Sequence, residues 1–153
     1  MKKLLLVSHA PSPNTERLQA AIISGAQDPA VEKVTIEQVP PLQCDAEKVL
    51  SCDAIILGTT ENLGYMSGAL KDFFDRIYYP CLEKKQGLPY VLYVRAGHDG
   101  TGTCRAVDSI TTGLRWKAVQ APLICRGPWN EDFITQAKEL GMTIAMSLDA
   151  GII

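Results

Sequence analysis

Short, uninterrupted apolar runs alternate along this chain with longer stretches of helical periodicity, and this alternation restricts the fold more than any other feature. Leu4–Val7, Ala54–Leu57 and Tyr90–Val94 are such runs, which are typical of strands buried on both faces of a sheet. Val34–Glu37 alternates apolar and polar residues instead, so we expect an edge strand with one solvated face. Pro122–Cys125 is a fifth, shorter candidate strand.

Apolar residues at three- and four-residue spacing predict helices between these strands. The helical stretches are Leu18–Ala26, 46–51, Met66–Tyr78, a segment that runs to about Lys117, and Phe133–Leu148. Ser12 is the expected N-cap of the first helix, and Pro13 its first residue. This alternation predicts one three-layer α/β domain over residues 1–153, with a parallel sheet between two layers of helices.

Composition excludes several functional classes. The net charge of −2 leaves no basic surface for nucleic acid, and no apolar stretch approaches the length of a membrane span. The apolar run near residue 4 is too short for a signal peptide. The five cysteines are scattered without C-x-x-C spacing, which favours a reducing compartment over a disulfide framework. We therefore expect a cytoplasmic protein with no nucleic-acid or membrane partner.

The segment after the first strand, Ser8–Thr15, is rich in polar side chains. Ser12, Asn14 and Thr15 supply hydroxyl and amide groups where a helix begins, and the free N–H groups and positive dipole end of a helix attract phosphate. The same residues are also ordinary N-cap residues. The sequence leaves both interpretations open, a phosphate site and a simple helix cap.

The segment after the third strand mixes a carboxylate, an amide, a glycine and an aromatic ring within one expected turn. Its residues are Thr59, Thr60, Glu61, Asn62, Leu63, Gly64, Tyr65 and Met66. Such a loop suits a planar heteroaromatic ligand, with backbone groups for its polar edge and apolar side chains for its face. The alternative is that Leu63, Tyr65 and Met66 only fasten the loop to the following helix.

A third polar segment follows the fourth strand and contains Ala96, Gly97, His98, Asp99 and Gly100. His98 could cover one face of a ligand, or could be a surface histidine without a role. Segments that follow parallel strands meet at one edge of the sheet, where open α/β sheets bind their ligands. The three segments together therefore predict a ligand site at that edge.

Other chemistries on related sheets lack their residues here. No cysteine stands in Cys-x5-Arg spacing, which excludes the thiolate phosphatases and arsenate reductases. Ser8 and His9 follow the first strand where response-regulator receivers carry carboxylates. The glycines of residues 97–102 fit no nucleotide-loop pattern, and His9 and His98 without an acidic cluster predict no metal site.

The stretch from Gly58 to Arg76, GTTENLGYMSGALKDFFDR, resembles the second flavin loop and following helix of the flavodoxin-like NAD(P)H-dependent FMN reductases, which include quinone reductases. The positions that match the usual family pattern are Gly58, Gly64, Met66, Ser67, Gly68, Leu70, Lys71, Phe73, Asp75 and Arg76. Ser12, Asn14 and Thr15 fall on or near the small-hydroxyl, Asn and Thr positions of a flavodoxin-type phosphate loop. The order of elements resembles this family along essentially the whole chain.

The resemblance implies a flavodoxin-like fold with strand order 2-1-3-4-5, FMN as cofactor, NAD(P)H as co-substrate, and a quinone or similar small molecule as acceptor. Chemistry would occur on the flavin, so no catalytic side chain is expected. Ser12, Asn14 and Thr15 would hold the phosphate end, and Ser8 would be a further cofactor-binding residue. The ring would lie between Thr59–Met66 and Ala96–Gly100, with Tyr65 and His98 flanking it.

The sequence departs from the family at several of these positions. Thr60 replaces a common proline and Asn62 a common tyrosine, while Pro11 and Pro13 bring no N–H groups to the phosphate loop. Two alternatives therefore remain open: an electron carrier of flavodoxin type, and a flavin-free binding protein. The family commonly forms dimers or tetramers, and Tyr78-Tyr79-Pro80 would suit a subunit interface or simply end a helix.

Overall fold

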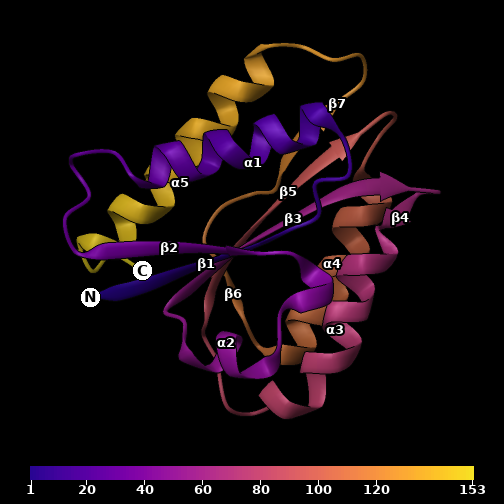
Figure 1. Cartoon of the computed structure of the whole chain (residues 1–153). Coiled ribbons are helices and arrows are strands. Elements are labelled where there is room, and N and C mark those ends of the chain that lie inside the picture. The colour runs from indigo at the N-terminus through magenta and orange to yellow at the C-terminus, as the bar shows by residue number, and fades with distance from the viewer.

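A parallel sheet forms the middle layer of the molecule, and helices cover both of its faces (Figure 1). The computed structural model describes residues 1–153. Its strands are β1 (Lys2–Ser8), β2 (Val34–Val39), β3 (Ala54–Asn62), β4 (Tyr65–Met66), β5 (Pro89–Ala96), β6 (Lys117–Ala118) and β7 (Leu123–Arg126). The order is β2-β1-β3-β5, and both β6 and β7 pair with β5. The predicted flavodoxin-like order is confirmed, with β7 as the predicted fifth strand.

The helices lie in two groups. Helices α1 (Pro13–Ala26) and α5 (Asp132–Asp149) cover one face, and α2 (Ala46–Ser51), α3 (Gly68–Cys81) and α4 (Thr101–Leu114) cover the other, with a short 3-10 turn η1 (Pro41–Gln43) before α2. Successive β1 residues serve the two cores in turn, since Leu4 and Leu6 face α1 and α5 while Leu5 and Val7 face α3. This double burial explains why the run is apolar without interruption.

Strand β2 lies at the edge of the sheet, as its alternating sequence predicts. Its Val34 and Ile36 are only partly buried against the α1–α5 core, while Thr35 and Glu37 are exposed. The apolar stripe of the third helix is also confirmed, because Leu70, Phe73, Phe74 and Ile77 are all buried against the sheet.

The fourth helix ends earlier than predicted, at Leu114 in place of about Lys117. Arg115 takes the left-handed conformation, with φ of 59°, and so terminates the helix. Lys117 then joins the sheet as part of β6, where its backbone N–H donates to the Leu88 carbonyl at 2.8 Å. A backbone contact with a distant strand therefore overrides the local helical pattern.

Helices α1 and α5 touch through their backbones. A methyl group added at Gly25 would lie 2.0 Å from the Lys138 carbonyl oxygen, and one at Gly141 would lie 2.1 Å from the Ile22 carbonyl oxygen. Only glycine permits so close an approach at these two positions. The contact fixes the position of α1, whose first turn carries part of the expected site. None of the helices combines the length and the hydropathy that a membrane span needs.

Candidate functional site

The first predicted segment joins β1 to α1 and ends in a capping box. Ser12 is the N-cap, as predicted, and its hydroxyl accepts a hydrogen bond of 3.3 Å from the Thr15 backbone N–H. In return, the Thr15 hydroxyl accepts one of 2.9 Å from the Ser12 N–H. Both hydroxyls that the sequence suggested for phosphate therefore take part in a helix cap.

Several donors nevertheless stay free at this helix end. The backbone N–H groups of Ala10 and Asn14 make no hydrogen bond within the chain, and Pro11 and Pro13 have none to offer. The Asn14 side-chain oxygen accepts only a long hydrogen bond of 3.4 Å from Arg17. Two free amides, a serine hydroxyl and the positive end of α1 form a donor set that fits a phosphate group.

The second predicted segment is a β-hairpin, whereas the sequence suggested a polar loop directly after a short strand. Strand β3 continues to Asn62, turns at Leu63 and Gly64, and returns as β4. The turn residues have φ of 53° and 76°, as a two-residue hairpin turn requires. Gly64 in the second turn position is the signal that could have revealed the hairpin.

The hairpin folds back over the beginning of α4. A methyl group at Gly102 would lie 2.5 Å from the Gly64 carbonyl oxygen, so the turn and the first turn of α4 are in backbone contact. At the base of the hairpin, the buried Thr59 hydroxyl accepts a hydrogen bond of 2.9 Å from the Ser67 N–H. Met66 is buried, while Leu63 and Tyr65 are exposed.

A single hydrogen bond joins the second predicted segment to the third. The Glu61 carboxylate accepts a bond of 2.7 Å from the backbone N–H of Gly100. Gly100 has φ of 77°, which favours glycine there. Nearby, the Asp99 carbonyl accepts a bond of 2.8 Å from Arg126, and His98 is exposed. The structure thus brings the predicted ring-binding segments together.

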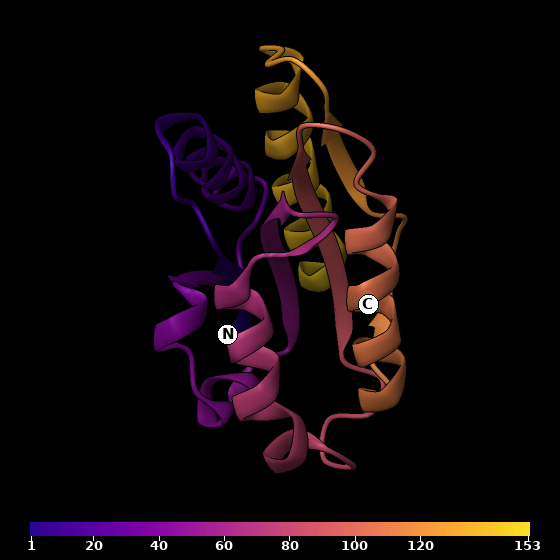
Figure 2. The same ribbon diagram turned by 90° about the vertical axis from the view of Figure 1, so that its right-hand side faces the viewer.

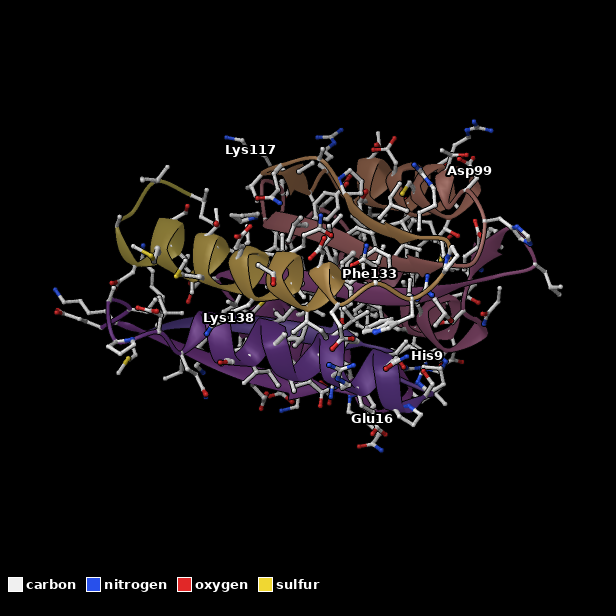
Figure 3. All side chains as sticks on the ribbon, turned by 90° about the horizontal axis from the view of Figure 1, so that it is seen from above. His9, Glu16, Asp99, Lys117, Phe133 and Lys138 are labelled. Carbon is white, nitrogen blue, oxygen red and sulfur yellow. The ribbon has the colours of Figure 1, made fainter.

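The first segment meets the second at the same edge, because the His9 N–H donates to the Gly58 carbonyl at 3.0 Å. Figure 2 views the molecule from this edge. Seen from above, His9 and Asp99 lie towards the same end of the molecule (Figure 3). Ser8 differs from the other predicted residues, because its buried side chain donates a hydrogen bond to Gln19 of α1.

An aromatic and arginine cluster after β7 also reaches this edge, and the sequence analysis missed it. The guanidinium groups of Arg17 and Arg95 lie 5.5 and 5.7 Å from the ring centroid of Trp129. Glu131 accepts hydrogen bonds from Trp129 and from Arg17. Arg95 donates to the Ala96 carbonyl at 2.9 Å. The signal available was position alone, since the segment after the last parallel strand ends at the ligand edge.

The charges in this cluster shift two pKa values. Hydrogen bonds from Arg17 and Trp129 lower the pKa of Glu131 to about 2, and the bond to Glu131 raises the pKa of Arg17. Both side chains are largely exposed, so their attraction is screened by water and salt. The cluster holds the β7–α5 segment against α1.

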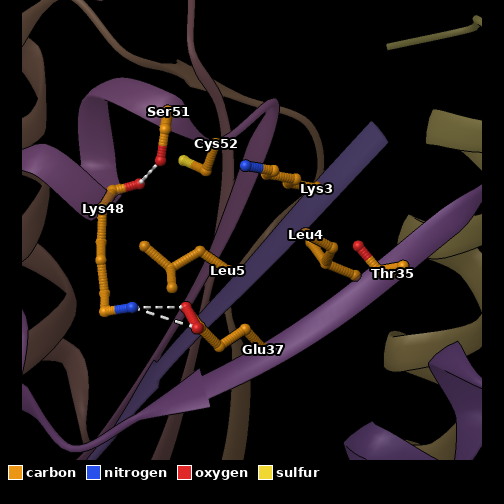
Figure 4. Close-up of a pocket in the computed structure, with 8 residues that line it drawn as sticks. All are labelled: Lys3, Leu4, Leu5, Thr35, Glu37, Lys48, Ser51 and Cys52. Carbon is orange, nitrogen blue, oxygen red and sulfur yellow. Dashed lines mark hydrogen bonds and ion pairs between the residues drawn. The ribbon is translucent and has the colours of Figure 1, made fainter. Parts of the chain in front are cut away.

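Two further features lie apart from the candidate site. A cavity of about 260 Å³ between β1, β2 and α2 contains the Lys48–Glu37 ion pair of 2.9 Å (Figure 4). No three metal-binding side chains come close enough to hold an ion. All five cysteines are free thiols, and burial raises the pKa of Cys44 and of Cys52 to about 12.

Residues 16–124 match the family described as NADPH-dependent FMN reductase, which is more than half of the chain. The chain belongs to that family. The match begins at Glu16, directly after the segment Ser8–Thr15, so the candidate phosphate segment lies outside it. A comparison with curated protein sequences found no match.

Solved structures share the fold at low sequence identity. A flavodoxin from the domain Archaea is 17% identical with a TM-score of 0.77, covering 95% of this chain and 98% of its own. A WrbA-like flavodoxin from Agrobacterium tumefaciens is 16% identical with a TM-score of 0.74, covering 99% of each chain. An azoreductase from Bacillus anthracis str. Sterne is 15% identical with a TM-score of 0.73, covering 96% and 100%. These similarities establish the flavodoxin-like fold.

Proposed function

We propose that this chain is a single-domain FMN-binding oxidoreductase that takes electrons from NAD(P)H and passes them to a quinone or a similar small acceptor. Membership of the FMN reductase family supports oxidoreductase activity and the involvement of FMN and NADPH. The observation that carries the proposal is the Glu61–Gly100 hydrogen bond, which joins two ligand-suited segments beside the N-terminus of α1. The two joined segments would hold a ring, and the N-terminus of α1 beside them would hold a phosphate.

The phosphate end of FMN would lie at the first turn of α1. The free N–H groups of Ala10 and Asn14 and the Ser12 hydroxyl would donate to its oxygens, with Thr15 holding Ser12 in place. The positive end of the helix adds a favourable charge. Since Pro11 and Pro13 contribute no N–H, we expect weaker FMN binding than a glycine-containing loop would give.

The ring end would lie between the hairpin at Thr59–Met66 and the segment Ala96–Gly100. Here the chain offers a carboxylate acceptor at Glu61 and a backbone donor at Gly100, which now satisfy each other. Tyr65 and His98 are exposed beside these groups and would flank the ring. When bound, FMN supplies the hydride and electron transfer. The protein's part is to position the ring and to leave one edge open to the acceptor.

We also propose that the protein forms a homodimer or homotetramer. Tyr79 is 79% exposed near the end of α3 and packs edge-on against Tyr78, with ring centroids 5.3 Å apart. An exposed tyrosine supported by a partly buried neighbour suits a subunit contact. Light scattering behind size-exclusion chromatography tests this, and a monomer at all concentrations would refute it.

The function is tested by titrating purified protein with FMN, followed by NADH or NADPH oxidation in the presence of a quinone. We expect quenching of flavin fluorescence and acceptor-dependent oxidation. Asn14→Ala keeps the backbone N–H but removes the side-chain amide, a further donor at this helix start, and should weaken FMN binding. It should not alter the melting temperature, because Asn14 lies outside the capping box, and Gln86→Ala serves as a distant control. Absence of flavin binding would overturn the proposal. Flavin binding without NAD(P)H oxidation would favour the electron carrier.

A further inference from the structure

A second cavity opens on the other side of β1, between the first half of α1 and the ends of β1 and β2. It has a volume of about 450 Å³, within the range of small-molecule sites. Its lining residues are Ser8, His9, Ala10, Pro11, Glu16, Gln19, Gln38, Pro40 and Pro41. Ser12, Asn14 and Thr15 do not line it, whereas Ala10 does, so this cavity borders the candidate phosphate site without including its hydroxyl groups.

Three polar side chains of the cavity wall form one hydrogen-bonded chain. Gln38 of β2 donates to the Ser8 hydroxyl at 3.3 Å, and that hydroxyl donates to the side-chain oxygen of Gln19 at 2.5 Å. Ser8 is 2% exposed, whereas both glutamines are half-buried. The buried hydroxyl therefore fixes the two carboxamide groups relative to each other.

This hydrogen-bonded chain of three side chains leaves one free donor and one free acceptor, whichever way the two glutamine amides are oriented. A serine hydroxyl has a single hydrogen, so it donates to one amide oxygen and accepts from the N–H₂ of the other amide. The glutamine whose oxygen accepts from Ser8, which is Gln19 in this structure, then keeps an unpaired N–H₂. The second, Gln38, keeps an unpaired oxygen. Both groups are accessible to the cavity or to solvent, since neither is among the buried polar atoms that lack a hydrogen-bond partner.

The side chains of the cavity disfavour an anion on the wall made by Glu16, Gln19 and Gln38. No lysine or arginine lines it, and the one charged side chain is the Glu16 carboxylate. Figure 3 shows His9 and Glu16 towards the same end of α1. Burial lowers the pKa of His9, so this ring is mainly neutral at pH 7. A phosphate or carboxylate would meet repulsion from Glu16 without a compensating cation.

Three prolines make most of the apolar part of the wall, and their rigid rings suit a flat ligand. They are Pro11, Pro40 and Pro41. Pro41 is held in place from the opposite side of the sheet, because Arg76 of α3 donates to its carbonyl at 2.6 Å and to that of Cys44 at 2.7 Å. Arg76, which the sequence analysis matched to the family pattern, thereby fixes the η1 side of the cavity.

We propose that this cavity binds a neutral planar molecule with a carboxamide or cyclic imide edge. One ligand N–H would donate to the free glutamine oxygen, and the ligand carbonyl would accept from the free glutamine N–H₂. The prolines would contact the flat faces. This site borders the proposed flavin site at Ala10, but its recognition groups are Gln19 and Gln38, held by Ser8, and it needs no bound FMN.

Three probes of one shape and different hydrogen-bonding patterns test the proposal. Benzamide carries a donor and an acceptor, benzoate two acceptors and a negative charge, and benzamidine only donors and a positive charge. Each is titrated into ¹⁵N-labelled protein without FMN, and the side-chain N–H₂ signals of Gln19 and Gln38 are followed. We expect saturable shifts with benzamide, none with benzoate, and at least tenfold weaker binding of benzamidine.

Variants separate recognition from folding. Gln38→Leu should weaken benzamide binding about tenfold through the loss of one hydrogen bond, and Gln86→Leu, at an exposed loop position, should leave it unchanged. If Gln38→Leu fails to fold, Gln19→Met tests the same chain from α1. Benzamidine binding as tight as benzamide would show that Glu16 alone selects the ligand and would overturn the proposal. So would benzoate binding, unmoved glutamine signals, or benzamide affinity that survives both substitutions.

Discussion

The Glu61 carboxylate accepts a hydrogen bond of 2.7 Å from the Gly100 backbone N–H, across 39 positions of sequence. This bond connects the β3–β4 hairpin to the turn before α4. Glu61→Ala should therefore release the Gly100 N–H and increase its hydrogen-exchange rate about tenfold. Exchange measured by NMR checks this, with Glu83→Ala as the control. Unchanged exchange at Gly100 would mean that the bond does not hold the two segments together.

Replacing glycine with alanine at the starts of two helices should change the free energy of unfolding in opposite directions. Gly102→Ala places a methyl group 2.5 Å from the Gly64 carbonyl oxygen, so we expect a loss of about 1–3 kcal/mol in the free energy of unfolding. Gly68→Ala meets nothing within 4 Å at the start of α3 and should gain about 0.5 kcal/mol. Urea denaturation of both variants gives the comparison. Equal effects would argue against the packing of the hairpin on α4.

Tyr93 carries a hydroxyl that is buried without a hydrogen-bond partner. Burial raises the pKa of this phenol, and the neighbouring Ser8 offsets the shift only in part. Tyr93→Phe should therefore be neutral or stabilise the fold by about 1 kcal/mol, because it removes a polar group that gains little from its surroundings.

Tyr90→Phe is the matched control, since the Tyr90 hydroxyl bonds to Thr111 at 2.9 Å and its removal should cost about 1 kcal/mol. Thermal unfolding of the two variants decides the sign. A clear destabilisation by Tyr93→Phe would indicate a hydrogen bond to that hydroxyl.

The Arg17–Glu131 ion pair should make a contribution to stability that depends on pH. The pKa of Glu131 is lowered from 4.5 to about 2, so the folded state binds this proton less readily than the unfolded chain. The contribution is complete above about pH 4.5 and is lost as the pH falls towards 2. It should be small and sensitive to salt, because both groups are exposed.

Melting temperatures of the parent protein and Glu131→Gln, measured in low salt at pH 6 and pH 3, test this. We expect the variant to be less stable at pH 6 and the difference to shrink at pH 3, with a parallel change in Trp129 fluorescence. Glu139→Gln controls for a change of net charge. A difference that grows with acidity would contradict the prediction.

Local chemistry determines which parts of this fold the sequence can predict. Ser12 and Pro13 specify the start of α1 through bonds and dihedral angles within four residues, and the alternation in β2 reports its edge position directly. The hairpin at Leu63 and Gly64 was harder to predict, because leucine rarely takes a positive φ. The end of α4 depends on pairing with Leu88, which no local pattern records.

The candidate site shows the same division. The types of side chain at Thr59–Met66 and Ala96–Gly100 are visible in the sequence, and parallel-sheet topology places them at one edge. Which group meets which is decided by tertiary packing, as with Glu61 and Gly100. The contacts of Trp129 with Arg17 and Arg95 could not be predicted for the same reason, since these three residues come from different parts of the fold.

The backbone contact of α1 with α5 has an evolutionary consequence. Gly25 and Gly141 each leave room for a carbonyl of the opposite helix, so neither can gain a side chain alone without moving α1. A homologue that carries alanine at either position must therefore hold its first helix farther from its last, and the turn that begins that helix moves with it. The absence of a side chain at positions 25 and 141 thus ties both positions to the geometry of the candidate phosphate site, and they should change together among relatives.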